Sequence, residues 1–180
     1  MLQITIPECE FFDEGTETFV HMDEKTIQLE HSLVSLSKWE SKWHKPFLGR
    51  EPKTEEETID YVRCMTITHN VSPLIYQRLT PEHYKQINDY IEDSMTATWF
   101  SKDSNSRSSR EVVTAEIIYF WMVTYGIPFE CEKWHLNRLL TLIRVCDRKN
   151  APSKKMSKAE QYRQNRALNA ARRSKLHSRG

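Results

Sequence analysis

The sequence is poor in glycine: its 180 residues include only Gly15, Gly49, Gly126 and Gly180. The dinucleotide-binding fingerprint and the P-loop both need clustered glycines, because the backbone must approach a phosphate closely. The four glycines here are widely separated. The sequence therefore excludes both kinds of nucleotide-binding loop.

Long apolar runs are missing as well. The longest covers residues 117–123, whereas a membrane-spanning helix needs about 20 apolar residues. Residues 1–7 lack the basic region, the apolar stretch and the small-residue cleavage site of a secretory signal. We therefore expect no membrane partner and a location in the cytoplasm.

Motifs that carry catalysis or metal binding are also lacking. Cys131 and His135, four residues apart, are a possible pair of metal ligands, but a structural zinc site needs four converging ligands. The favoured interpretation is a buried thiol and a hydrogen-bonded histidine. Because neither G-x-S-x-G nor H-E-x-x-H is present, we predict no enzyme activity, no catalytic or metal-binding residues and no cofactor.

Charge is distributed very unevenly. Residues 148–180 contain eleven Lys and Arg against the single acid Glu160, a balance of +10. The remaining fifteen bases and twenty-four acids give residues 1–147 a balance of −9. A composition break of this size predicts an acidic, mostly helical globular domain over residues 1–147 and a basic tail, weakly helical or disordered, over residues 148–180.

The apolar periodicity predicts an α+β fold that is mainly helical, with a few short N-terminal strands and a possible β-hairpin. Alternation at Leu2, Ile4 and Ile6 predicts a strand, and further strands are expected over residues 18–22 and 26–29, with a turn at residues 13–15. Extended segments at residues 95–100 and 110–113 flank a polar loop, which suggests the hairpin.

Helix starts are marked by capping residues. Thr54, Ser72, Thr80 and Thr114 stand at expected helix starts, where their hydroxyl groups can accept bonds from the first free amides. An earlier helix is expected from Ser32, where the apolar residues change to helical spacing. The proline at residue 46 ends the first helix, and Gly126 suits the left-handed position after the helix from Thr114. A last core helix is expected over residues 130–146, and we expect these two final helices to form the core.

Two local patterns resemble functional sites but have simpler interpretations. The acids Glu55, Glu56 and Glu57 lie in the first turn of a predicted helix, where the helix dipole favours negative charge. Trp39 and Trp43 have bases beside them, as in nucleic-acid-binding proteins. Their four-residue spacing more often marks core packing. We interpret the acids as a solvated helix start and the tryptophans as core.

The basic tail is the strongest candidate for a binding segment. A capping box at Ser157–Glu160 opens an Ala- and Arg-rich helical stretch that ends near Lys175 and has little to bury. Such a segment can fold on a negatively charged surface, either nucleic acid or an acidic protein, including the acidic domain of this chain or of a sister copy. The alternative is a solubilising extension. The candidate partner-binding residues are Lys154, Lys155, Lys158, Arg163, Arg166, Arg172, Arg173 and Lys175.

Four segments together resemble a group of small proteins from the tail-gene modules of long-tailed bacteriophages, of the tail assembly chaperone kind. These segments are residues 29–43, 95–100, 127–140 and 167–173, which begin with Leu-Glu-His-Ser, Met-Thr-Ala-Thr, Ile-Pro-Phe-Glu and Ala-Leu-Asn-Ala. The resemblance covers almost the whole chain. It implies a helical, non-enzymatic assembly factor that keeps the tape measure protein soluble and recruits tail tube protein around it in the host cytoplasm.

Two other classes of function stay open, together with self-association. The chain can be a structural neck or tail component of the virion. It can also be a nucleic-acid-binding module that acts through the basic tail, in which case binding would depend steeply on salt.

Overall fold

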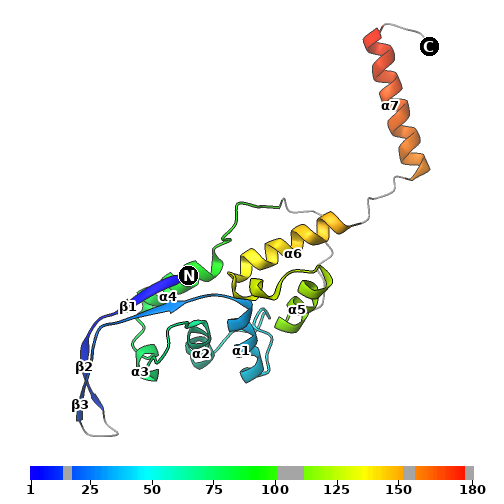
Figure 1. Cartoon of the computed structure of the whole chain (residues 1–180). Helices are drawn as coiled ribbons and strands as arrows, with labels where there is room; N and C mark the ends of the chain where they lie inside the picture. Colours follow the sequence, from blue (N-terminus) through cyan, green and yellow to red (C-terminus); the bar gives the residue numbers. More distant parts are fainter. Residues whose placement is uncertain (14–17, 101–111, 152–156, 177–180) are drawn as a thin grey trace. The chain divides into compact units, whose positions relative to one another are not determined.

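The computed structural model describes residues 1–13, 18–100, 112–151 and 157–176. The chain divides into two compact units, Met1–Cys146 and Asp147–Gly180. The first unit is mostly helical, with short antiparallel strands at its N-terminal end (Figure 1). The predicted α+β class is confirmed.

The strands form one long hairpin that is interrupted once. Strand β1 (Leu2–Ile6) pairs with β4 (Lys25–Leu29), and β2 (Cys9–Asp13) pairs with β3 (Thr18–Met22). The register is the same in both ladders, since Ile6 faces Lys25 and Cys9 faces Met22. Pro7 lies in the gap and has no amide hydrogen to donate, which accounts for the break in the ladder.

The alternation that predicted the first strand also sets its buried face. Ile4, Ile6, Ile27 and Leu29 are buried, whereas Thr5 and Thr26 share an exposed hydrogen bond of 2.9 Å on the other face. Strand β2 was missed because Cys-Glu-Phe-Phe-Asp does not alternate. Of the predicted turn at residues 13–15, the last two residues lie outside the described parts of the chain.

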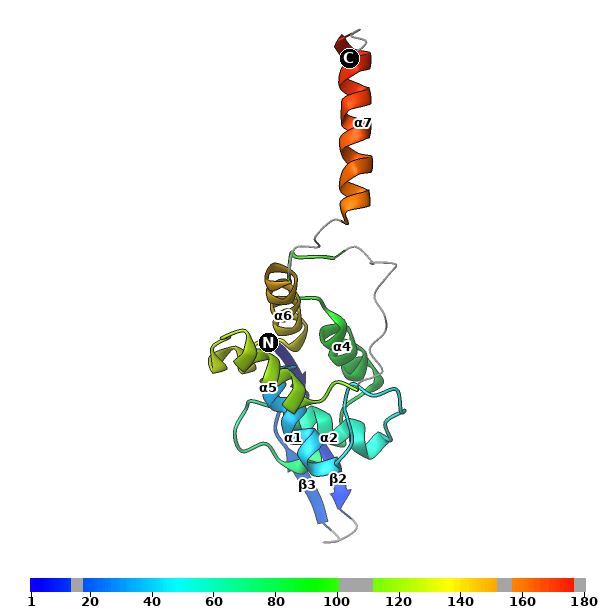
Figure 2. The same ribbon diagram turned by 90° about the vertical axis from the view of Figure 1, so that its right-hand side faces the viewer.

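Helix α1 (Leu33–Trp43) begins after Ser32, where the helical spacing predicts, and α2 (Glu55–Met65) begins after Thr54, where its capping box predicts. In the structure Ser32 forms a capping box as well. The two helices pack side by side (Figures 1 and 2). Helix α1 ends at His44, which adopts the left-handed conformation with φ 51°, two residues before the proline. After α2 the chain returns to the sheet, because the Ile67 amide donates to the Gln28 carbonyl of β4 at 2.8 Å.

Helices α3 (Pro73–Tyr76) and α4 (Pro81–Glu92) begin with proline after the capping residues Ser72 and Thr80, as predicted. Helix α4 lies beside β1. The Tyr90 hydroxyl of α4 donates to a Glu30 carboxylate oxygen at 2.7 Å, and the other Glu30 oxygen lies 3.0 Å from the N-terminal amine. Glu30 therefore ties the start of the chain and α4 to the end of β4.

The predicted hairpin over residues 95–113 is wrong, since the described residues Met95–Phe100 form no strand. Their backbone is held by local side-chain bonds instead. Asp93 Oδ1 accepts from the Met95 amide at 2.8 Å, and Met95 has a positive φ of 48°. Such bonds compete with sheet pairing. The polar loop at residues 101–109 and two residues of the second segment lie outside the described chain.

Helix α5 (Ala115–Thr124) starts after Thr114 as predicted, but the Thr114 hydroxyl makes no capping bond. Glu40 of α1 takes that role, because its Oε2 accepts from the Ala115 amide at 2.7 Å. Gly126 follows the helix with φ +63°, as expected.

The last core helix starts later than predicted. Residues Phe129–Lys133 form a 3-10 helix, η1, and α6 runs over Leu136–Asn150. His135 forms a β-bridge with Ser32, and the Leu136 amide donates to the His31 carbonyl at 2.7 Å. This contact, distant in sequence, holds His135 in an extended conformation and delays the start of α6.

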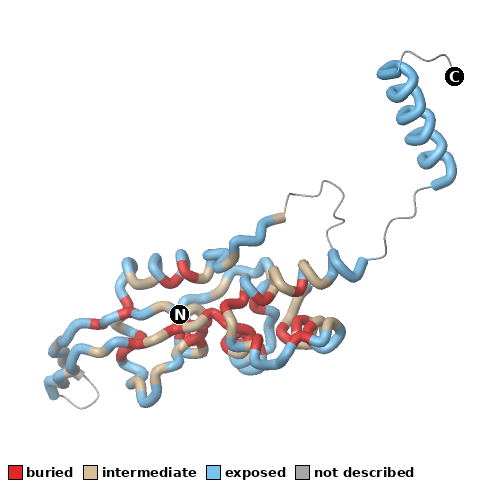
Figure 3. Tube along the Cα trace, turned by 45° about the horizontal axis from the view of Figure 1, so that its top comes forward, coloured by how far each residue is buried: buried red, intermediate tan, exposed pale blue. Residues whose placement is uncertain are grey.

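Most of the buried residues lie in the helices and strands of the first unit (Figure 3). The sheet face, α1 and α2 supply many core residues, and α6 adds Leu136, Leu139 and Ile143. None of the helices in the described parts of the chain is both long enough and apolar enough to cross a membrane.

Candidate partner-binding site

The predicted basic residues lie mainly on one helix, α7 (Lys158–Leu176). Its capping box is formed: Ser157 Oγ accepts from the Glu160 amide at 3.2 Å, and Glu160 Oε2 accepts from the Ser157 amide at 3.0 Å. All nineteen residues of α7 are exposed (Figure 3). Lys154 and Lys155 fall outside the described residues.

Helical spacing brings only some of these bases together. Lys158, Arg166 and Arg173 follow one another at eight and seven residues, so they share a face with Tyr162. Arg172 borders this face, whereas Arg163 and Lys175 project from other sides. The helix therefore presents positive charge around most of its circumference, with one concentrated face.

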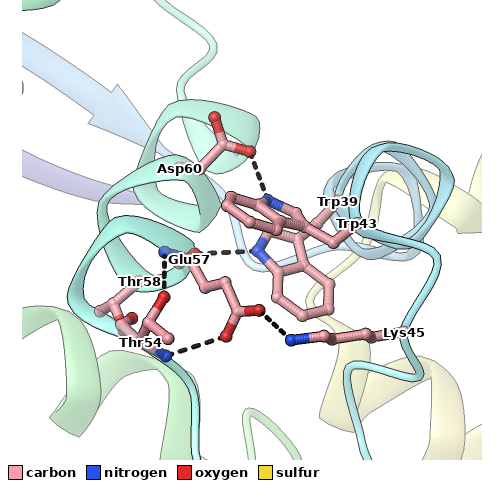
Figure 4. A network of polar contacts seen from close by, with 7 residues as sticks. All are labelled: Trp39, Trp43, Lys45, Thr54, Glu57, Thr58 and Asp60. Carbon is pink, nitrogen blue, oxygen red and sulfur yellow. Dashed lines mark hydrogen bonds and ion pairs between the residues drawn. The ribbon is translucent and has the colours of Figure 1, made fainter.

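The tryptophans are core residues, as interpreted from their spacing. Trp39 is buried, and its indole nitrogen donates to the Glu57 carbonyl at 2.8 Å (Figure 4). Trp43 donates from its indole to Asp60 Oδ2 at 2.9 Å. Both rings thus join α1 to α2. In the segment that follows Trp43, Phe47 is buried, whereas His44, Lys45 and Pro46 are exposed.

The acidic helix start is only partly solvated. Glu55 and Glu56 are exposed, but Glu57 is 2% exposed, which corrects the prediction for that residue. Glu57 Oε2 accepts from the Thr54 amide at 2.9 Å, and Oε1 lies 2.5 Å from Lys45 Nζ (Figure 4). These bonds lower the pKa of Glu57, and the hydrogen bond from Lys45 has the largest effect. In turn, the hydrogen bond to Glu57 raises the pKa of Lys45. The pair is a charged link between α2 and the loop after α1.

The Cys131 and His135 interpretation is confirmed by their contacts. Cys131 is a buried free thiol, and His135 Nε2 bonds to the Tyr90 carbonyl at 2.9 Å. Across the described residues, no three His, Cys, Asp or Glu side chains converge as metal ligands.

A second candidate surface was not predicted. Helix α5 was expected to be core, yet Phe120 is 65% exposed and Val123 63% exposed. Phe129 of η1 is 57% exposed, and its ring centroid lies 6.4 Å from that of Tyr119. Tyr119, Phe120 and Val123 are neighbours at helical spacing. We call Tyr119, Phe120, Val123 and Phe129 the α5–η1 face.

Acidic groups surround this face. Glu116 precedes Phe120 by one turn and is exposed, as is Glu130 of η1. The Tyr119 hydroxyl donates to Glu132 Oε2 at 2.9 Å. Burial, that hydrogen bond and the nearby carboxylates raise the pKa of Tyr119 to about 12, so the phenol stays neutral and donating.

The sequence carries a partial signal for the α5–η1 face. Ile117, Ile118, Phe120, Trp121, Met122 and Val123 surround α5 on all sides, and a helix apolar all round is either enclosed or part of an interface. The buried side is Ala115, Ile118 and Met122. On the opposite side Phe120 and Val123 are exposed.

No known family model matches this chain, and comparisons with curated proteins and with solved structures give no match either.

Proposed function

We propose that this protein is a non-enzymatic tail assembly factor of a long-tailed bacteriophage. In this proposal it binds the tape measure protein in the host cytoplasm, keeps that protein soluble and helps to recruit tail tube subunits. The resemblance of four segments to tail assembly chaperones supports the assignment, and the exposed α5–η1 face supports the mode of binding.

The α5–η1 face is the observation that carries the proposal. Phe120, Val123 and Phe129 each leave more than half of their surface exposed, on adjoining elements. Contiguous apolar surface on a folded protein marks a site of protein interaction. An extended, helix-rich client fits such a surface, because an amphipathic helix can lay its apolar side on Phe120 and Val123.

Helix α7 provides a second surface of opposite charge. Its bases are exposed along the whole helix, whereas the sequence up to residue 147 is acidic. Two electrostatically different surfaces allow one molecule to contact a client and a neighbour at the same time.

Co-expression with the tape measure protein of the same phage tests this function. We expect the wild-type chain to move the client from the insoluble to the soluble fraction and to co-purify with it. Replacing Phe120 and Val123 together by serine should reduce the soluble client strongly. The matched control is Ile67→Ser, which alters a side chain that is 47% exposed and lies on the segment after α2.

Two results would contradict the proposal. One is a client that stays insoluble with the folded wild-type chain. The other is equal solubilisation by the wild-type chain and by the double variant, since the α5–η1 face would then contribute nothing.

A further inference from the structure

We propose that helix α7 of one copy packs on the α5–η1 face of a second copy, so that two chains exchange their tails. The occupant of the apolar surface is thus the basic helix of this same protein. The inference does not depend on client binding and is measured on this chain alone.

Charge complementarity is the first argument. Helix α7 contains six bases and one acid, a balance of +5. Residues 115–133 contain Glu116, Glu130 and Glu132 against Lys133, a balance of −2. The whole sequence repeats the pattern, because the +10 of residues 148–180 is close to the −9 of the rest. The basic tail of one chain therefore balances the net negative charge of one acidic domain.

The apolar residues of α7 supply the second argument. Tyr162, Leu168 and Leu176 are all exposed, and at about 100° per residue they fall within a sector of about 120°. Lys158 and Arg172 fall inside that sector, and Arg166, Arg173 and Lys175 border it. The apolar side chains of α7 thus lie among bases, which suits an apolar face surrounded by acids.

The spacing of the two leucines of α7 is compatible with the length of α5. Leu168 and Leu176 are eight residues apart, about 12 Å along a helix. Helix α5 has ten residues and is about 15 Å long. The two leucines of α7 can therefore contact most of the length of α5.

The charges of α6 favour a second copy over the same chain. Helix α6 begins two residues beyond Trp134, after η1, and is about 22 Å long, with fifteen residues. The exposed positions of α6 include Arg144, Arg148 and Lys149, and Arg138 is half-buried. Like charges on the two helices disfavour packing of α7 along α6 of the same chain.

Zero-length crosslinking tests the proposal with the full chain. Equal amounts of unlabelled and nitrogen-15-labelled protein are mixed, treated with a carbodiimide that joins carboxylates to lysine amines, and analysed by mass spectrometry. We expect crosslinks from Glu116 or Glu130 to Lys158 or Lys175, with half of them joining one labelled and one unlabelled peptide. The exposed acids Glu55 and Glu56 of α2 serve as controls and should give few such crosslinks.

Sedimentation velocity measures the strength of the contact. We expect dimers at about 0.05 M salt and a large shift to monomers at about 1 M salt, because the charges are exposed and screened. Phe120→Ser should raise the dissociation constant at least about tenfold, as loss of a central aromatic contact does, whereas Ile67→Ser should leave it unchanged. Replacing Glu116 and Glu130 by lysine should prevent dimers, and adding Arg166→Glu and Arg173→Glu should restore them.

Several outcomes would overturn the proposal. Crosslinks only between peptides of the same label would place the helix on its own chain. A monomer at every salt concentration, without crosslinks between tail and face, would show that α7 binds neither copy. Dimers that persist in the doubly charge-reversed Glu116 and Glu130 variant would place the interface elsewhere. Crosslinks to the face that disappear only with nuclease treatment would assign α7 to nucleic acid.

Discussion

Glu40 is the side chain that joins the first helix of the fold to α5. It is buried on α1, where Oε1 accepts from the Phe47 amide at 2.7 Å and Oε2 accepts from the Ala115 amide at 2.7 Å. The carboxylate therefore replaces the missing Thr114 cap, and its charge suits the positive end of α5. Sequence patterns do not reveal such a cap, because the residues it joins are 75 positions apart.

Glu40→Gln tests this role. The glutamine amide keeps one acceptor oxygen but turns an NH₂ donor towards the second backbone amide. We expect the free energy of unfolding to fall by about 1–3 kcal/mol, the cost of leaving one buried donor without a partner. Urea denaturation measures it, and the exposed Glu56→Gln should stay within about 0.5 kcal/mol of wild type. Equal stability of the Glu40 and Glu56 variants would refute the capping role.

His31 is a buried histidine that folding holds neutral. Its Nδ1 shares a hydrogen bond of 2.6 Å with the Tyr61 hydroxyl, and its ring centroid lies 5.1 Å from that of His135. Burial, and to a smaller extent the nearby His135, lowers the pKa of His31 from 6.5 to about 3. Below pH 6.5 the unfolded chain gains a proton at this residue that the folded chain does not.

Stability should therefore fall as the pH drops from 6.5 towards 3. Linkage gives a loss from His31 of about 2 kcal/mol by about pH 5. Urea denaturation at about pH 7 and about pH 5 measures the difference. The variant His31→Asn can keep a bond to Tyr61, and in it the loss of unfolding free energy between the two pH values should be smaller by about 2 kcal/mol. In the variant of the exposed His69, His69→Asn, this loss should be the same as in wild type. A full pH dependence in His31→Asn would show that another group is responsible.

Helix α6 tests the packing at the scale of one element. Its buried face consists of Leu136, Leu139 and Ile143, and Leu140 is only half-buried. Leu139→Ala should destabilise the protein by about 2–5 kcal/mol, as cavities in packed cores do. Leu140→Ala should cost clearly less. Thermal or urea unfolding of the two variants shows which face of α6 is buried. A larger loss of stability from Leu140→Ala would mean that the helix is rotated about its axis.

Helix starts were predictable from the sequence because their signals are local. Ser32, Thr54 and Thr80 form capping boxes within three residues, and all three helices begin where expected. The late start of α6 was not predictable, since it depends on the pairing of His135 with Ser32, more than a hundred residues away. Strand β2 was missed for a similar reason, because it is defined by its pairing with β3.

At the scale of the whole molecule, composition identified one candidate surface and not the other. The bases of α7 form a charge run that any reading of the sequence reveals. The α5–η1 face consists of apolar residues that a sequence assigns to the core, such as Phe120 and Val123. Which side of an apolar helix stays exposed depends on what packs against it, and only the fold supplies that information.

Both proposed interactions use the α5–η1 face, so client and tail helix should compete for it. A chain that covers its apolar surface with the tail of a sister copy would remain soluble until a client arrives. Charge attraction, which is screened by salt, would then hold the tail more weakly than an apolar client helix.

Hydrogen–deuterium exchange on the complex with the tape measure protein tests the central claim most directly. If the client occupies the α5–η1 face, amides of Ala115–Thr124 and Phe129–Lys133 should exchange more slowly in the complex than in the free protein at high salt. The amides of α2, a helix that contributes no residue to the α5–η1 face, provide the internal reference. Protection of α5 and η1 without a change in α2 is the result we expect. Unchanged exchange in α5 and η1, with a stable complex formed, would contradict the account.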